Sequence, residues 1–187
     1  IADFQTGLHL DAAGLGIALL GQPLGALATI FVASSIIERA GTRPVLAIGL
    51  PVLALSSLGL ALAPGLAAFI ALFARYGAAF AITNVAINVE ADRVEAASGR
   101  IVMNSCHGVW SVGFLLAALL GTLARGIALP PAVHLAAVVP FALAFAFAFG
   151  LPMQPAPPRP HAGGPAKRVA WPTRMTLLLL GYMLASI

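Results

Sequence analysis

The chain has 187 residues, of which 60% are hydrophobic and 9% are charged, and its mean hydropathy is +0.99. A soluble domain usually carries about 25% charged residues, so this composition excludes an ordinary soluble domain and predicts a helical integral membrane protein. The formal net charge is +4, but the basic residues form no dense patch, which argues against nucleic-acid binding. A single cysteine, Cys106, excludes an internal disulfide and a cysteine-based zinc site.

Five apolar runs follow one another along the chain, and each is long enough to cross a bilayer as a helix. They predict an all-α, polytopic membrane helix bundle. Asp11 precedes the first run and is expected to cap that helix. Gly21 and Gly25 are four residues apart and predict a close approach to another helix, while Pro23 predicts a bend. The predicted spans are residues 12–37, 44–63, 66–89, 101–123 and 133–153.

The connections between the runs are short and polar. A charged turn covers residues 34–44, Pro64 and Gly65 form a second turn, and residues 90–100 are expected to form a polar loop. Residues 154–174 are rich in Pro, Gly and basic residues and predict a linker between two bundles. Residues 175–187 are apolar but too short to span, so we expect them to begin a further span.

The basic residues are distributed unequally between alternate connections. Such an excess marks the cytoplasmic side of a membrane protein. The charged turn and the linker are therefore expected to be cytoplasmic, in a multi-pass protein of the inner (plasma) membrane. Eight basic residues fall on that side, namely Arg39, Arg43, Arg93, Arg100, Arg159, Lys167, Arg168 and Arg174, and Arg125 alone falls on the other.

The charged turn carries a recognisable pattern. It resembles the loop between the second and third helices of major facilitator superfamily transporters, which runs roughly Gly-x-x-x-Asp-Arg-x-Gly-Arg/Lys-Arg/Lys. This chain matches at Arg39, Gly41 and Arg43 and departs with Ser34, Glu38 and Thr42. The resemblance implies that Glu38, Arg39, Gly41 and Arg43 act as a conformational latch rather than in substrate binding.

The resemblance also implies a domain organisation. Residues 1–153 would form helices two to six of the N-terminal six-helix half, residues 154–174 the central cytoplasmic linker, and residues 175–187 the start of helix seven. The chain begins and ends inside such patterns, so we expect it to be a fragment. The first helix and the C-terminal half of the same protein would then be its partners.

A second resemblance lies further along the chain. Asn84, Asn88, Glu90 and Glu95, followed by a His107-Gly108-x-x-Ser111-x-Gly113 run, resemble the branch of the superfamily near fucose permease. That branch typically has an acidic residue where this chain has Asn84. The resemblance implies a small polar solute, either sugar-like or another hydroxylated metabolite.

Two asparagines in the third span are candidates for substrate binding. Asn84 and Asn88 are four residues apart and therefore share a helix face, and Gly77 and Ala81 on that side are expected to leave space. Polar side chains within a span usually face the bundle interior or a wet cavity. One reading is hydrogen bonding to a polar solute, and the other is hydrogen bonding between helices.

The fourth span carries four further candidates. Asn104, His107 and Ser111 belong to a small and polar stripe at helical spacing, and Trp110 beside them could stack on a sugar ring. A histidine changes charge between about pH 5 and 8, so His107 is a candidate for proton coupling. Ordinary packing of Trp110 and a structural role for His107 stay open as alternatives.

Arg75 is a basic residue inside a span, about 14 Å from its start at 1.5 Å per residue. At 100° per residue it points away from Asn84, and no acidic residue of the chain lies at its depth. An anionic substrate is one candidate partner; another helix of the protein, backbone carbonyls and water are the others.

These observations predict a secondary active transporter that works by alternating access, with the bilayer, a small solute and protons as its partners. The alternatives are a membrane scaffold and an exporter of an anionic or amphipathic compound. His107 and Ser111 lack an oriented third group, so no enzyme activity is expected. No cofactor and no metal site are expected either.

Overall fold

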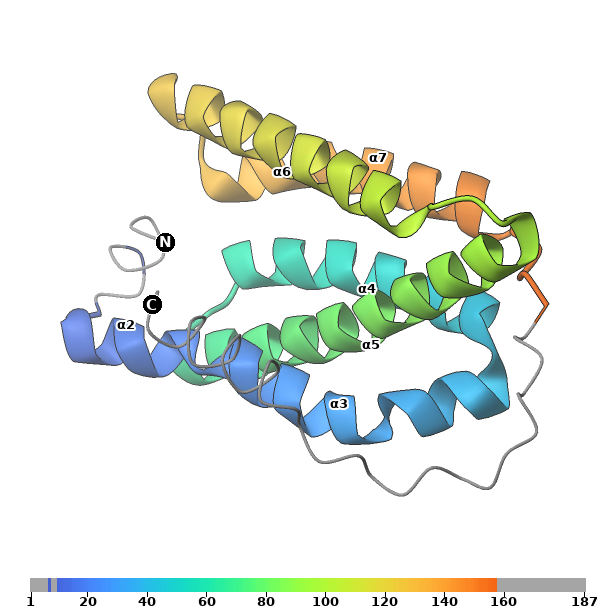
Figure 1. The fold of residues 1–187 in the computed structure, drawn as a ribbon. Helices are drawn as coiled ribbons and strands as arrows, with labels where there is room; N and C mark the ends of the chain where they lie inside the picture. Colours follow the sequence, from blue (N-terminus) through green and yellow to red (C-terminus); the bar gives the residue numbers. More distant parts are fainter. Residues whose placement is uncertain (1–6, 8–9, 158–187) are drawn as a thin grey trace, which may run out of the picture.

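The computed structural model describes residue 7 and residues 10–157, and all the elements of that part are helices. Five spans are long and apolar enough to cross a membrane, the first made of two consecutive helices. The predicted all-α membrane bundle is therefore confirmed (Figure 1). Most of the predicted linker and the predicted start of helix seven lie outside the described residues. The helices are α2 (Ala12–Leu19), α3 (Gly21–Ala40), α4 (Thr42–Ala61), α5 (Leu66–Ser98), α6 (Met103–Gly126) and α7 (Pro131–Gly150).

The first span is interrupted near its middle. The Asp11 side chain caps α2 as predicted, accepting a 2.7 Å hydrogen bond from the Gly14 amide. The helix breaks at Leu20, between α2 and α3. Pro23 has no N–H to donate to the carbonyl four residues earlier, and its ring crowds that carbonyl. The interruption therefore falls where the predicted proline bend would disturb the hydrogen-bond ladder.

Helix α5 packs directly against α3 through glycines, and the two ribbons run side by side (Figure 1). A Cβ atom added at Gly25 would overlap the Ala74 backbone, and one added at Gly77 would overlap the Gln22 carbonyl. The predicted close approach at Gly25 is confirmed. The space expected beside Gly77, however, is filled by the backbone of the first span, so that expectation was wrong.

The predicted polar loop at residues 90–100 was also wrong. Helix α5 continues through it to Ser98 and ends at Gly99, whose left-handed backbone (φ 65°) suits glycine. The buried face of the helix continues along the same stripe, with Thr83, Ala86 and Glu90 all buried. A 33-residue helix is about 50 Å long, which exceeds the roughly 30 Å hydrocarbon core. Its polar last turns can therefore extend beyond the apolar layer.

The remaining helices differ in how closely they pack. Helix α4 packs against both α5 and α7, whereas α6 contacts α5 only sparsely and has a single buried residue, Ala124. Large apolar side chains stay exposed, including Val109 on α6 and Phe141 on α7, which are 73% and 78% exposed. Such surfaces suit a lipid or protein environment rather than water.

One end of the bundle gathers three connections. The α3–α4 turn, the end of α5 and the end of α7 lie together at the right in Figure 1. The turn is made by Gly41, whose φ of 83° is costly for any residue with a side chain. Beneath it lies a small apolar cluster of Ile37, Val45, Leu46 and Ala86. This packing holds the start of α4 against α5 and positions the polar cluster described below.

Candidate functional site

The two asparagines of α5 share one helix face, as predicted. The Asn88 side-chain amide donates to both the backbone carbonyl and the Oδ1 atom of Asn84, each at 2.9 Å. The Asn84 amide nitrogen and the Asn88 carbonyl oxygen have no further partner among the described residues, and Asn84 is exposed. The pair therefore presents one donor and one acceptor that a bound molecule could use.

The four candidates on α6 are all exposed. The Ser111 hydroxyl donates to the His107 carbonyl of its own helix at 2.9 Å, and Trp110 stacks on Phe114 with ring centroids 5.8 Å apart. No hydrogen bond or ring contact of the described residues joins these side chains or Asn104 to the α5 asparagines. The structure thus leaves the two predicted groups on separate helices.

The start of α6 is positioned by an acidic side chain from the end of α5. The Glu95 carboxylate accepts hydrogen bonds from the Val102 and Met103 amides at 3.0 and 3.2 Å. A carboxylate at a helix N-terminus satisfies amides that have no partner within the helix and complements the helix dipole. Glu95 therefore holds the start of α6, the helix that carries the four candidates, close to the end of α5.

A cavity of about 770 Å³ lies between α4, α5, α6 and α7. Its wall is mostly aliphatic and aromatic, with polar atoms offered by Ser57 and Tyr76. The Tyr76 ring stacks on Phe80 with centroids 6.5 Å apart. Neither polar residue was a candidate from the sequence, although Tyr76 is the one tyrosine within the predicted spans and directly follows Arg75.

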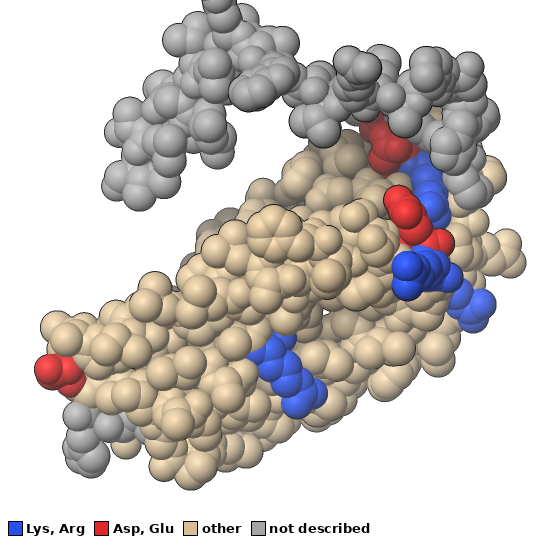
Figure 2. Space-filling view, turned by 90° about the horizontal axis from the view of Figure 1, so that it is seen from below, with Lys and Arg blue, Asp and Glu red and all other residues tan. Residues whose placement is uncertain are grey.

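Arg75 lies on a different side of α5 from the asparagines. It lines a groove of about 390 Å³ between α3, α4 and α5. Figure 2 shows that most Lys, Arg, Asp and Glu side chains on this face gather at one end of the molecule, while its middle is largely uncharged. Arg75 and the asparagine pair therefore belong to separate candidate sites.

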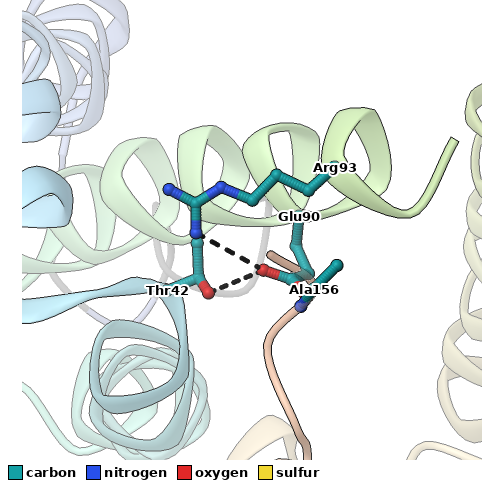
Figure 3. Close-up of polar contacts among 4 residues, drawn as sticks. All are labelled: Thr42, Glu90, Arg93 and Ala156. Carbon is teal, nitrogen blue, oxygen red and sulfur yellow. Dashed lines mark hydrogen bonds and ion pairs between the residues drawn. The ribbon is translucent and has the colours of Figure 1, made fainter. Parts of the chain in front are cut away.

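The charged end holds a polar cluster centred on Glu90 (Figure 3). The buried Glu90 carboxylate accepts a 2.7 Å hydrogen bond from the Thr42 hydroxyl and another from the Ala156 amide. The Arg93 guanidinium lies 4.0 Å from the same carboxylate. Glu90 thus joins the start of α4 to the segment after α7. A second connection between these two parts is made by the Arg43 guanidinium, which donates a hydrogen bond to the Leu151 carbonyl.

This cluster was not predicted from the sequence. Glu90 was assigned to a loop, and Thr42 appeared only as a departure from a basic position. Of the predicted latch residues, Arg43 takes part in the connection through Leu151. Glu38 and Arg39 are exposed and have no hydrogen bond or ion pair within the part of the chain that the structure describes. The spacing of Thr83, Ala86 and Glu90 on one helical face is the signal that could have identified Glu90 as buried.

Metal ligation has no support in the described part of the chain. Within residue 7 and residues 10–157, no three His, Cys, Asp or Glu side chains come together in a group that could hold an ion. The arrangement instead offers hydrogen bonds, one isolated guanidinium and a charged cluster at one end.

Two curated proteins are similar to this chain. An uncharacterized MFS-type transporter of Yersinia pestis is 38% identical over 117 residues, which are 62% of this chain and 28% of that protein. An uncharacterized transporter of Sinorhizobium fredii is 38% identical over 128 residues, which are 67% of this chain and 33% of that protein. The matched part of the chain thus spans about a third of each relative's length or less. Both relatives are named as transporters rather than enzymes, in agreement with the expectation of no enzyme activity.

Two further comparisons were negative. No family model matches the chain. No solved structure matches it.

Proposed function

We propose that this chain is part of a major facilitator superfamily transporter that moves a small polar solute across the inner membrane by alternating access. The observation that carries the proposal is the similarity to two transporters, one of them MFS-type. The five candidate spans support it. The spans would be helices two to six of the N-terminal half, and residues 154–174 would join them to the second half.

The charged end is the proposed cytoplasmic side. Arg39, Arg43, Arg93 and Arg100 all belong to connections or helix ends on that side, whereas Arg125 lies near the end of α6. An excess of basic residues at one side favours a cytoplasmic location for that side. The other four basic residues of the predicted cytoplasmic set lie outside the described residues.

The asparagine pair is the proposed point of solute recognition. A neutral solute with hydroxyl or amide groups can donate to the Asn88 oxygen and accept from the Asn84 nitrogen. The transported solute would lie between the two halves of the protein, as in other secondary transporters, and would meet the pair toward the charged end of α5. Relationship to the fucose-permease branch would make this solute sugar-like.

Proton coupling would need a group other than the pair, because a carboxamide does not titrate in the physiological range. His107, exposed on α6, is the proposed candidate within the described helices. Trp110 and Ser111 on the same helix, with Asn104, would add contacts to the solute when the halves close.

The proposal is tested with the full protein reconstituted into liposomes. A panel of hydroxylated solutes is screened for uptake, and affinity is then measured for the Asn88→Leu variant. Leaving a solute group unpaired costs about 1–3 kcal/mol, so the dissociation constant should rise about tenfold to a hundredfold. Thr122→Ala serves as a control for α6, because Thr122 is not a candidate for solute contact and its hydroxyl already donates to the Ala118 carbonyl of its own helix.

Two outcomes would contradict the proposal. Absence of uptake for every solute, with correctly inserted protein, would favour a scaffold. Normal affinity of Asn88→Leu for a transported solute would show that the pair stabilises helix packing instead of binding the solute.

A further inference from the structure

The groove beside Arg75 is bounded by three helices and is nearly free of polar groups. Apart from Arg75 and Thr29, its lining side chains are aliphatic, alanine, glycine or proline. The Thr29 hydroxyl donates to the Gly25 carbonyl of its own helix at 2.9 Å and is therefore already satisfied. Arg75 is thus the one charged residue among those that line the groove. The groove's volume of about 390 Å³ lies within the usual range for small-molecule sites.

The Arg75 side chain has no hydrogen bond, ion pair or ring contact within the described residues. It lies nine residues after the start of α5, which is about 14 Å along the helix axis. A guanidinium at such a depth is costly unless it is paired with an anion or reaches water. The site therefore favours a ligand that brings one negative charge to this position.

The groove extends from Arg75 in one direction. Its α4 wall runs from Val52 to Pro44, near the turn at Gly41, a distance of about 12 Å along the helix. Side chains of a helix tilt toward its N-terminus, so Arg75 is directed back toward the Pro64–Gly65 end. A ligand would place its charged head at Arg75 and its apolar part along the groove toward Pro44.

The ligand chemistry follows from these two properties. A carboxylate has two oxygens, and a guanidinium can satisfy both through two parallel hydrogen bonds. A phospholipid would bring a phosphodiester, ester groups and a second acyl chain into a groove with no other uncommitted polar group among its lining residues, which is costly. We propose that the groove binds a long-chain carboxylate, with its head on Arg75 and its alkyl chain against α3, α4 and α5.

This site is independent of the solute path proposed above. Arg75 and Asn84 are nine positions apart on α5, which places them about 180° apart around the helix. The carboxylate proposal and the solute proposal can therefore succeed or fail separately.

The test measures equilibrium binding of radiolabelled hexadecanoate to the full protein in phosphatidylcholine nanodiscs. Hexadecanol, which has the same chain without the charge, is measured in parallel. Wild-type protein should bind hexadecanoate more tightly. Arg75→Gln should weaken hexadecanoate binding at least tenfold, since hydrogen bonds between charged groups are among the strongest, and should change hexadecanol binding less than twofold.

A matched control is Arg100→Gln, which removes the same charge from an exposed residue just beyond the C-terminal end of α5; its hexadecanoate affinity should equal wild type. Ala78→Leu adds bulk to the groove wall while leaving the arginine in place, and it should weaken both ligands. This second variant keeps the test informative if Arg75→Gln fails to insert.

Several results would overturn the proposal. These are an absence of saturable hexadecanoate binding to wild type, equal binding of hexadecanoate and hexadecanol, or unchanged hexadecanoate binding in both groove variants. Stronger competition by phosphatidylglycerol than by unlabelled hexadecanoate would assign the groove to a phospholipid. Failure of wild type to bind, with Arg75 cross-linking to a carboxylate elsewhere in the protein, would assign the charge to an internal ion pair.

Discussion

The buried hydrogen bond between Thr42 and Glu90 gives a direct test of how the charged end is held together. The Thr42 hydroxyl donates to the Glu90 carboxylate at 2.7 Å, and both residues are buried. A hydrogen bond to a charged group contributes about 1.5–3 kcal/mol. Thr42→Val keeps the side-chain shape, removes the donor and should therefore lower the free energy of unfolding by about that amount.

A double-mutant cycle isolates this pair from other effects. Thr42→Val, Glu90→Leu and the double variant are unfolded in mixed micelles with increasing dodecyl sulfate, and helix content is followed by circular dichroism. Residues in direct contact show interaction energies of about 0.5–3 kcal/mol, and we expect a value above about 1 kcal/mol here. The control is Thr122→Val, because the Thr122 hydroxyl is exposed and bonds only to the Ala118 carbonyl of its own helix.

Thr122→Val should change stability by no more than about 0.5 kcal/mol, as most surface substitutions do. If the Thr42–Glu90 interaction energy were below about 0.3 kcal/mol, within the usual additivity of distant sites, the bond would not hold α4 to α5. The charged end would then have to be stabilised by the apolar cluster beneath it.

Three further predictions concern packing, topology and the turn. Gly77→Ala should destabilise the protein by about 1–3 kcal/mol, because the added Cβ meets the Gln22 backbone. Gly108→Ala, where the added Cβ meets open space, should be neutral or stabilising. Equal unfolding curves for the two variants would contradict the close α3–α5 contact. In a Cys106→Ser background, Ser98→Cys should resist an impermeant thiol reagent in intact cells, and ready labelling there would reverse the proposed topology. Arg39→Ala should slow transport by the reconstituted full protein while leaving solute affinity near wild type, and a large affinity loss with normal turnover would rule out a latch role.

The sequence by itself determined the features that depend on local pattern and on the bilayer. The lengths of the apolar runs predicted the five spans because a helix needs about 20 residues to cross the hydrocarbon core. Asp11 as a cap and the turn at Gly41 follow from backbone requirements within a few residues. The shared face of Asn84 and Asn88 follows from the helical repeat alone.

Only the tertiary structure decided how each helix is rotated about its axis. The spans are apolar over most of their surface, so the hydrophobic pattern indicates only weakly which face meets a neighbour. Glu90 was misassigned for this reason, since its partner Thr42 is 48 residues away and local polarity alone favours a loop. Likewise, Gly77 could be read as leaving space until the backbone of the first span was seen to fill it.

The same distinction applies to the candidate sites. Arg75 could be predicted to lack a carboxylate partner within the chain, because no acidic residue shares its depth. The groove that it lines is built by residues of α3 and α4 far away in sequence. Side chains from separate helices form a cavity only when long-range packing sets the distances between those helices, and a pattern within one helix carries no information about those distances.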